Sequence, residues 1–212
     1  MNKLLISLLL SSTLIGGVQA QKKENYYVKH VEFPQDATLE QKVDMAARLV
    51  PTPQQYAWQQ MELTAFLHFG INTFTGREWG DGKEDPNLFN PTELDAEQWV
   101  SNLKEAGFKM VILTAKHHDG FCLFDSKLTD YKATNTKAGR DLVREFVDAC
   151  REEDLKVGLY FSIIDWKHPD FPKYGDRQHP MRNNEAYKDE KIDFDRYLDY
   201  MHGQVKELVT NY

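Results

Sequence analysis

Polar side chains follow a short apolar run near the middle of the chain. The run from Met110 to Ala115 is rich in aliphatic and β-branched residues and does not alternate, which is typical of a strand buried on both faces of a parallel sheet. Lys116, His117, His118 and Asp119 follow it directly. Parallel α/β folds place their binding and catalytic groups at the carboxyl ends of strands. A solvated loop with two surface histidines is the alternative interpretation.

Two other apolar runs end in groups of the same kind. Residues 64–69 read TAFLHF and carry His68, and residues 157–162 read VGLYFS and carry Tyr160. The long loop after the first run holds Glu78 and Trp79. The carboxyl ends of parallel strands meet at one edge of a sheet, so these side chains and the two histidines are expected to line one site. Taken singly, each also has a structural reading: His68 as a core histidine, Trp79 as a rim anchor, and either Tyr160 or its neighbour facing the covering helices.

The residue types favour a sugar over a metal. Neutral His, Glu, Trp and Tyr offer directed hydrogen bonds and flat apolar faces, which suit the hydroxyls and C–H patches of a sugar ring. Adjacent His117 and His118 would point to opposite faces if the strand geometry continued, and His68 and Asp119 do not complete a convincing ligand spacing. We therefore expect neither a metal nor a cofactor. No Gly-rich phosphate fingerprint follows the first strand.

Strand, loop and helix recur three times in this order. The first expected helix starts at residues 90–92 and ends at Gly107. The second starts after a cap at Asp141. The third is predicted from an apolar face near the end of the chain. That face comprises Phe194, Tyr197, Leu198, Met201, Val205 and Leu208. Long loops after strands and short returns after helices predict an α/β fold, a (β/α)8 TIM-like barrel of which about the first three units are present. An open doubly wound sheet is the competitor. A barrel closes with eight units, so we expect the amino-terminal part of a longer protein.

The amino-terminal residues have the pattern of a secretory signal. Residues 1–20 combine a charged start at Lys3, an apolar stretch and a Val-Gln-Ala cleavage pattern, so the protein is expected to be exported and periplasmic or secreted. Residues 21–57 form a polar lead-in with expected helices near 39–50 and 54–63. Residues 58–212 are expected to form the incomplete α/β barrel domain. No second apolar run is long enough for a membrane span.

Charge and cysteine content exclude some partners. The net charge of -7 argues against nucleic acid and anionic membranes as partners. Cys122 lies in an aromatic run and Cys150 on an apolar helical stripe, so buried free thiols are expected, although an exported protein could join them. The oligomeric state does not follow from the sequence.

Three segments resemble family 29 glycoside hydrolases, the α-L-fucosidases. They read AFLHFGINTFTGREWG, MVILTAKHHDGFCLFDS and VGLYFSIIDW. Two flanking pieces match in the same order, FNPTELDAEQWVSNLKEAGFK and RDLVREFVDACREEDLK. The resemblance runs from about Trp58 to Tyr212, and the pair LHFG and AKHHDGF is its most specific part.

The resemblance implies a retaining exo-glycosidase that hydrolyses terminal α-L-fucose from fucosylated oligosaccharides or glycoconjugates. It implies a fucose pocket built from His68, Glu78, Trp79, His117, His118 and Tyr160. A retaining enzyme needs two carboxyl groups about 5–5.5 Å apart. The resemblance puts the nucleophilic Asp just after Tyr212 and the acid/base further on, so no catalytic residue is expected within this chain and residues 21–212 alone are expected to be inactive. A catalytically inactive carbohydrate-binding barrel and a metal-dependent barrel hydrolase are the alternatives.

Overall fold

The computed structural model describes residues 26–212, and the predicted signal peptide at residues 1–20 lies outside the described residues. The chain divides into two compact units, Met1–Tyr56 and Ala57–Tyr212. Within residues 26–212, no helix is both long enough and apolar enough to cross a membrane.

The described part of the first unit holds α1 (Leu39–Ala46). Its start is a capping box: the Gln41 N–H donates to Thr38 Oγ1, and the Thr38 N–H donates to Gln41 Oε1. No residue of α1 is buried. The helix expected near residues 54–63 is α2 (Pro53–Gln59), which begins at Pro53 because proline suits the first position of a helix.

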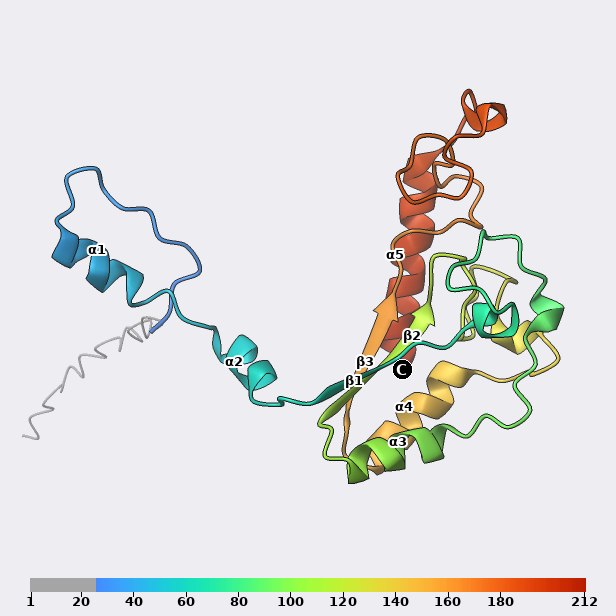
Figure 1. Ribbon diagram of the computed structural model, residues 1–212, viewed down its shortest axis with the longest axis horizontal. Coiled ribbons are helices and arrows are strands. Elements are labelled where there is room, and N and C mark those ends of the chain that lie inside the picture. The colour runs from blue at the N-terminus through green and yellow to red at the C-terminus, as the bar shows by residue number, and fades with distance from the viewer. Residues whose placement is uncertain (1–25) are drawn as a thin grey trace, which may run out of the picture. The chain divides into compact units, whose positions relative to one another are not determined.

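The second unit contains a three-stranded parallel sheet in the order β1 (Thr64–Leu67), β2 (Met110–Lys116) and β3 (Lys156–Phe161). All three predicted strands are present. The register pairs Phe66 with Ile112 and Ile112 with Gly158. Figure 1 shows the three strands running side by side, with α3 and α4 beneath them. These elements form a partial α/β fold.

Helices cover one face of this sheet. They are α3 (Ala96–Glu105), α4 (Leu142–Glu152) and α5 (Phe194–Asn211). Val111 and Leu113 of β2 are buried against apolar side chains of α3 and α4, and Leu208 of α5 joins the same core. Each buried aliphatic side chain in such a core stabilises the fold by about 1.5–3 kcal/mol.

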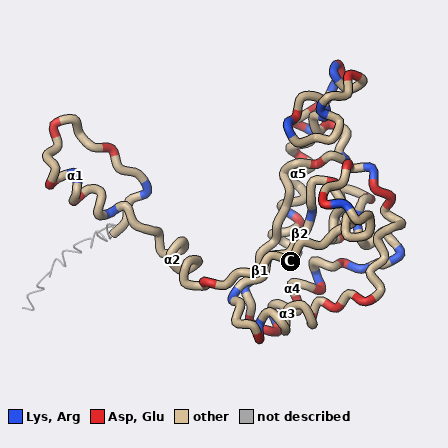
Figure 2. The backbone as a smooth tube through the Cα atoms, viewed as in Figure 1, with Lys and Arg blue, Asp and Glu red and all other residues tan. Residues whose placement is uncertain are grey.

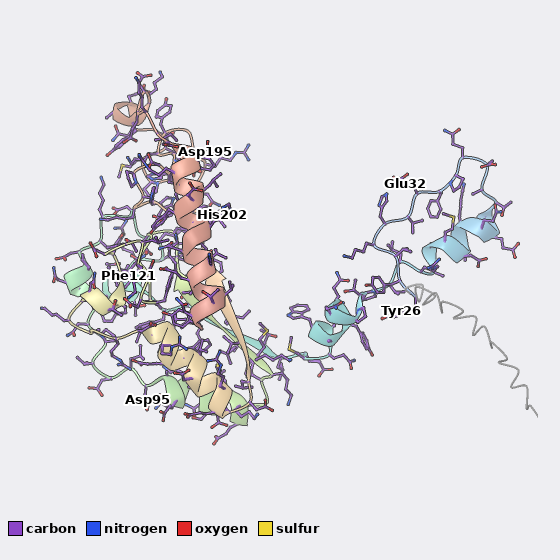
Figure 3. All side chains as sticks on the ribbon, turned by 180° about the vertical axis from the view of Figure 1, so that it is seen from behind. Tyr26, Glu32, Asp95, Phe121, Asp195 and His202 are labelled. Carbon is purple, nitrogen blue, oxygen red and sulfur yellow. The ribbon has the colours of Figure 1, made fainter. Side chains whose placement is uncertain are left out.

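The helix starts are set by aspartate caps. The predicted cap at Asp141 is confirmed, because its carboxylate accepts the Arg144 N–H at 3.0 Å. The predicted start of the first covering helix at residues 90–92 is wrong: Asp95 accepts the Gln98 N–H, and α3 begins at Ala96. Asp95 is labelled at this point in Figure 3. A Gly107 φ of +91° follows the end of this helix, as a glycine stop requires.

The buried face of α5 differs in part from the predicted face. Tyr197 and Leu208 are buried as expected, but Val205 is 38% exposed and its neighbour Gln204 is fully buried. Gln204 takes the inner position because its amide bonds to buried polar groups, described below. The predicted free thiols are confirmed: Cys122 and Cys150 are both buried and unpaired.

Long connections follow the carboxyl ends of the strands and carry short 3-10 turns. The turns are η1 (Ile71–Phe74), η2 (Pro86–Leu88), η3 (Ala133–Asn135) and η4 (Glu185–Tyr187). Figure 2 shows acidic and basic residues interspersed along these loops. The returns from α3 to β2 and from α4 to β3 are short. The long loops therefore all lie at one end of the sheet, where they can build a site.

Candidate functional site

Four of the six predicted site residues form a ring cluster at the carboxyl ends of the strands. The His117 ring lies 4.6 Å from the His68 ring and 4.2 Å from the His118 ring, centroid to centroid. Tyr160 stacks on His117 with centroids 5.8 Å apart. The strand register brings these rings together, because Thr114 pairs with Tyr160 on β3. On the other side, the Thr114 hydroxyl accepts the Phe69 N–H and donates to the Phe69 carbonyl, next to His68.

The other two predicted residues come from the loop after β1. Trp79 is 50% exposed, and its indole lies 6.3 Å from the His118 ring and 6.4 Å from the Trp166 ring. Glu78 is exposed and lines a pocket of about 220 Å³. The complete lining is His68, Gly70, Asn72, Thr73, Arg77, Glu78, His117 and Asp119. The structure thus brings all six predicted residues to one edge of the sheet.

The two adjacent histidines lie together, because the strand geometry that would send their rings to opposite faces does not continue to them. The strand β2 ends at Lys116, before either histidine. The next residues turn back, with the Gly120 N–H donating to the His117 carbonyl at 3.0 Å and Gly120 at a φ of +83°. The two imidazole planes are therefore only 38° apart.

The surroundings of His117 and His118 favour the neutral form of both imidazoles. Burial, followed by the nearby His118 and His68, lowers the pKa of His117 to about 4. Burial also lowers the pKa of His118, and His68 lowers it further. Neutral imidazoles both donate and accept hydrogen bonds, which suits them to uncharged hydroxyls.

Asp119 is a buried carboxyl group at the wall of the pocket. Its Oδ2 accepts the Asn72 Nδ2–H at 2.8 Å, and its Oδ1 accepts the Phe121 N–H at 2.8 Å. Burial raises the pKa of Asp119 to about 7, and Glu84 adds to the rise. Asn72 was not among the predicted site residues. It lies in a Gly/Asn/Thr-rich loop where nothing in the local pattern separates it from its neighbours.

A second buried carboxylate shapes the loop that carries Trp79. The two Glu84 carboxylate oxygens accept the N–H groups of Asp81 at 2.6 Å and Gly82 at 3.0 Å. Gly80 has no room for a side chain, because a Cβ there would lie 2.2 Å from Glu84 Oε1. The Glu84 carboxylate thus packs directly against the backbone at Gly80, the residue after Trp79.

Lys116 is the last residue of β2 and the first of the polar run, but it does not line the pocket. The ladder between β2 and β3 is irregular between Thr114 and Lys116, so that Lys116 pairs with Phe161. Its ammonium lies over the Phe161 ring and donates to Asp165 Oδ2 at 2.9 Å and Gln204 Oε1 at 3.0 Å. The irregularity turns Lys116 toward the helix side, because a bulge shifts the alternation of side chains by one residue.

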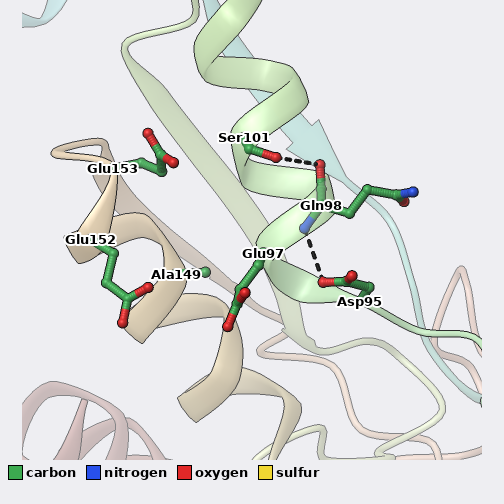
Figure 4. Close-up of a pocket in the computed structure, with 7 residues that line it drawn as sticks. All are labelled: Asp95, Glu97, Gln98, Ser101, Ala149, Glu152 and Glu153. Atoms are coloured by element: carbon green, nitrogen blue, oxygen red, sulfur yellow. Dashed lines mark hydrogen bonds between the residues drawn. The ribbon is translucent and has the colours of Figure 1, made fainter.

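Two other features of the described residues were compared with this site: possible metal-binding groups and a surface hollow between two helices. Within residues 26–212, no group of three or more His, Cys, Asp or Glu residues is arranged to hold a metal ion. Figure 4 shows a hollow of about 360 Å³ between α3 and α4, lined by carboxylates that include Asp95, Glu97 and Glu152. It lies on the helix side of the sheet, away from the strand ends.

Fold and site together define a class: an α/β protein with a polar site, which includes a cluster of histidine and tyrosine rings, at the carboxyl ends of parallel strands. A family model described as Alpha-L-fucosidase matches residues 20–212. The chain belongs to the α-L-fucosidase family.

Individual relatives agree with this membership. Alpha-L-fucosidase 1 of Arabidopsis thaliana is 41% identical over 162 residues, which cover 75% of this chain and 30% of that protein. The structure of alpha-L-fucosidase isoenzyme 1 from Paenibacillus thiaminolyticus matches with a TM-score of 0.70 and 55% identity, over 75% of this chain and 40% of that one. A GH29 alpha-L-fucosidase structure from Bacteroides thetaiotaomicron matches with a TM-score of 0.62 and 33% identity, over 77% and 39%. The chain thus spans well under half the length of these relatives.

Proposed function

We propose that the full-length protein is an exported, retaining exo-glycosidase that removes terminal α-L-fucose from glycans or glycoconjugates. The observation that carries this proposal is the cluster of His68, His117, His118 and Tyr160 at the strand ends of a chain in the α-L-fucosidase family.

The chemistry of the cluster suits a sugar such as fucose. Three imidazoles and a phenol offer several hydrogen bonds to hydroxyls within one small region. The half-exposed indole of Trp79 adds a flat apolar surface beside them, on which a sugar C–H face or a methyl group can pack. Glu78 supplies a carboxylate that accepts from hydroxyl groups at the pocket wall.

We further propose that the three-stranded sheet is the first part of a (β/α)8 barrel. The parallel order β1-β2-β3, the helices on one face and the long loops at the carboxyl ends support this arrangement. In such a barrel the site just described would lie at the face where active sites are found.

The two catalytic carboxyl groups are proposed to lie in sequence that follows Tyr212. Retention requires a nucleophile and an acid/base about 5–5.5 Å apart. The family resemblance assigns the nucleophile to an Asp shortly after this residue and the acid/base further on. The residues described above would bind and orient the sugar for that pair.

Export is proposed from the amino-terminal pattern of residues 1–20. Cleavage after Ala20 would leave Gln21 as the first residue, and mass spectrometry of the exported protein measures this directly. A protein that retains Met1 would contradict the proposal.

The activity is tested in the full-length protein with an aryl α-L-fucoside. His117→Ala and His118→Ala should each lower kcat/KM by about tenfold or more, because each removes directed hydrogen bonds to the sugar. His202→Ala is the matched control, because His202 lies on the exposed side of α5 (Figure 3). Binding of L-fucose without any turnover would identify an inactive carbohydrate-binding protein instead. Unchanged kcat/KM in both site variants would show that the site is misassigned.

A further inference from the structure

Ser162, the residue directly after β3, contacts the ring of His118. Its Oγ lies 2.6 Å from His118 Nδ1. The neighbouring backbone ties the same two segments together, since the Ser162 N–H donates to the Lys116 carbonyl at 3.0 Å and the Trp166 N–H donates to the His118 carbonyl at 2.8 Å. His118 is thus fixed to the loop after β3 through its backbone as well as its ring.

The hydrogen-bonding capacity of the Ser162 hydroxyl decides which way the bond to His118 runs. A hydroxyl has one proton to donate and two lone pairs that accept. The proton is used by the Ile164 carbonyl at 2.7 Å, which can only accept. One lone pair is used by the Ile164 N–H at 3.1 Å. Only a lone pair remains for His118, so Nδ1 of the imidazole must carry the hydrogen.

The other ring nitrogen is then defined as well. A neutral imidazole has one N–H and one bare lone pair, so Nε2 of His118 is an acceptor. The ring is half-buried beside His117 and Trp166, and burial favours this neutral form. An acceptor at this position pairs with a hydroxyl that donates, and it repels a carbonyl or ether oxygen.

We infer that Ser162 is a positioning residue that holds His118 as the Nδ1–H tautomer, so that His118 Nε2 accepts a hydrogen bond from a donor hydroxyl of the substrate. The substrate part of this inference rests on the proposed function. The tautomer part rests only on the contacts of Ser162.

The tautomer is measured by NMR on the full-length protein labelled with ¹⁵N-histidine, because the two ring nitrogens have different shifts when protonated and bare. The chain has 7 histidines, and His118→Gln identifies the signal of interest. We expect the Nδ1–H form in the wild type and a shift toward the Nε2–H form in Ser162→Ala. An Nε2–H form in the wild type overturns the inference without any variant.

Kinetics on an aryl α-L-fucoside test the positioning role. Ser162→Ala should lower kcat/KM by about 3- to 10-fold through a raised KM, as expected for a hydrogen bond weakened by the wrong tautomer. Ser162→Thr keeps the hydroxyl and should restore both the tautomer and the KM. Ser101→Ala is the control, because the Ser101 hydroxyl donates to the Gln98 carbonyl on α3 and lines the hollow between α3 and α4, not the candidate site.

The outcomes separate this inference from the proposed function. An unchanged KM in Ser162→Ala, in a protein whose tautomer has shifted, overturns the positioning role. A wild-type protein that turns over no fucoside refutes the proposed function and with it the substrate part, whereas the wild-type spectrum still decides the assignment of the His118 proton.

Discussion

Lys116 and Asp165 form an ion pair that is closed to solvent. Lys116 Nζ lies 2.9 Å from Asp165 Oδ2, and the two side chains are 0% and 1% exposed. The other oxygen of Asp165 accepts the N–H groups of Lys167 at 3.0 Å and His168 at 2.9 Å. The pair therefore joins the end of β2 to the start of the loop after β3, and Lys116 directly precedes His117 of the candidate site.

Removal of one member of this pair should be strongly destabilising. Lys116→Met leaves a buried carboxylate without its cation, which typically costs about 3–5 kcal/mol. Urea unfolding of the full-length protein measures the change. Lys127→Met is the control, because Lys127 pairs with Asp125 at an exposed position and such pairs contribute about 1 kcal/mol or less. Equal losses in the two variants would contradict the structural role of the buried pair.

His117 should make stability depend on pH. Its pKa is about 4 in the folded protein, below the ordinary value of 6.5, so the unfolded chain binds more protons between these values. Stability should therefore fall as the pH drops from about 6.5 to about 4. His117→Gln should weaken this dependence, whereas the exposed His202→Gln should not. Thermal unfolding at several pH values checks both, and identical profiles for wild type and His117→Gln would exclude a buried neutral imidazole.

Asn72 should matter more at high pH than at low pH. It donates to Asp119, whose pKa of about 7 makes this carboxyl group charged in mildly alkaline solution and neutral in mildly acidic solution. A hydrogen bond to a charged acceptor is worth about 1 kcal/mol more than one to a neutral acceptor. Asn72→Ala should thus lose more stability at alkaline than at acidic pH. Asn87→Ala, which removes a donor to Asp85 in an exposed turn, serves as the comparison.

Replacement of Gly82 by any other residue should destabilise the loop that carries Trp79. Its φ is +78°, and a Cβ there would lie 2.5 Å from the Trp166 carbonyl oxygen. Gly82→Ala therefore combines backbone strain with a backbone clash, and should cost more than the ~1–2 kcal/mol of strain alone. Gly76→Ala isolates the strain, because Gly76 has a φ of +65° and open space around it. Stability and kcat/KM on an aryl α-L-fucoside are both measured. A Gly82→Ala variant that behaves like Gly76→Ala would contradict the tight packing.

The strands and the position of the candidate site could be predicted because they follow from local patterns. The apolar run of β2 does not alternate, so it is buried on both faces as a strand of a parallel sheet. The histidines that follow it then lie at the carboxyl end of that strand. For Tyr160 and Phe161 the pattern left open which of the two faces the helices, and the structure answers it: Phe161 packs against the core and Tyr160 lies beside His117.

The features that were missed depend on contacts between distant segments. Simple alternation gives Lys116 the same face as Thr114, and only the irregular pairing with β3 turns it toward α5. Gln204 and Val205 both lie near the edge of a helical stripe, and the buried ammonium of Lys116 selects the glutamine. Ser162 carries no local signal either, because its role depends on a histidine 44 positions earlier in the chain.

The rate at which the buried thiols react can report local opening of the fold. Burial raises the pKa of Cys122 to about 12 and that of Cys150 to about 11, and only a thiolate reacts readily with alkylating reagents. Cys122 also accepts a contact from the Gln204 amide at 3.2 Å, beside the buried ion pair. Iodoacetamide can therefore label Cys122 only while this layer is open. The labelling rate therefore measures how often this part of the fold opens beneath the candidate site, and the measurement needs no introduced probe.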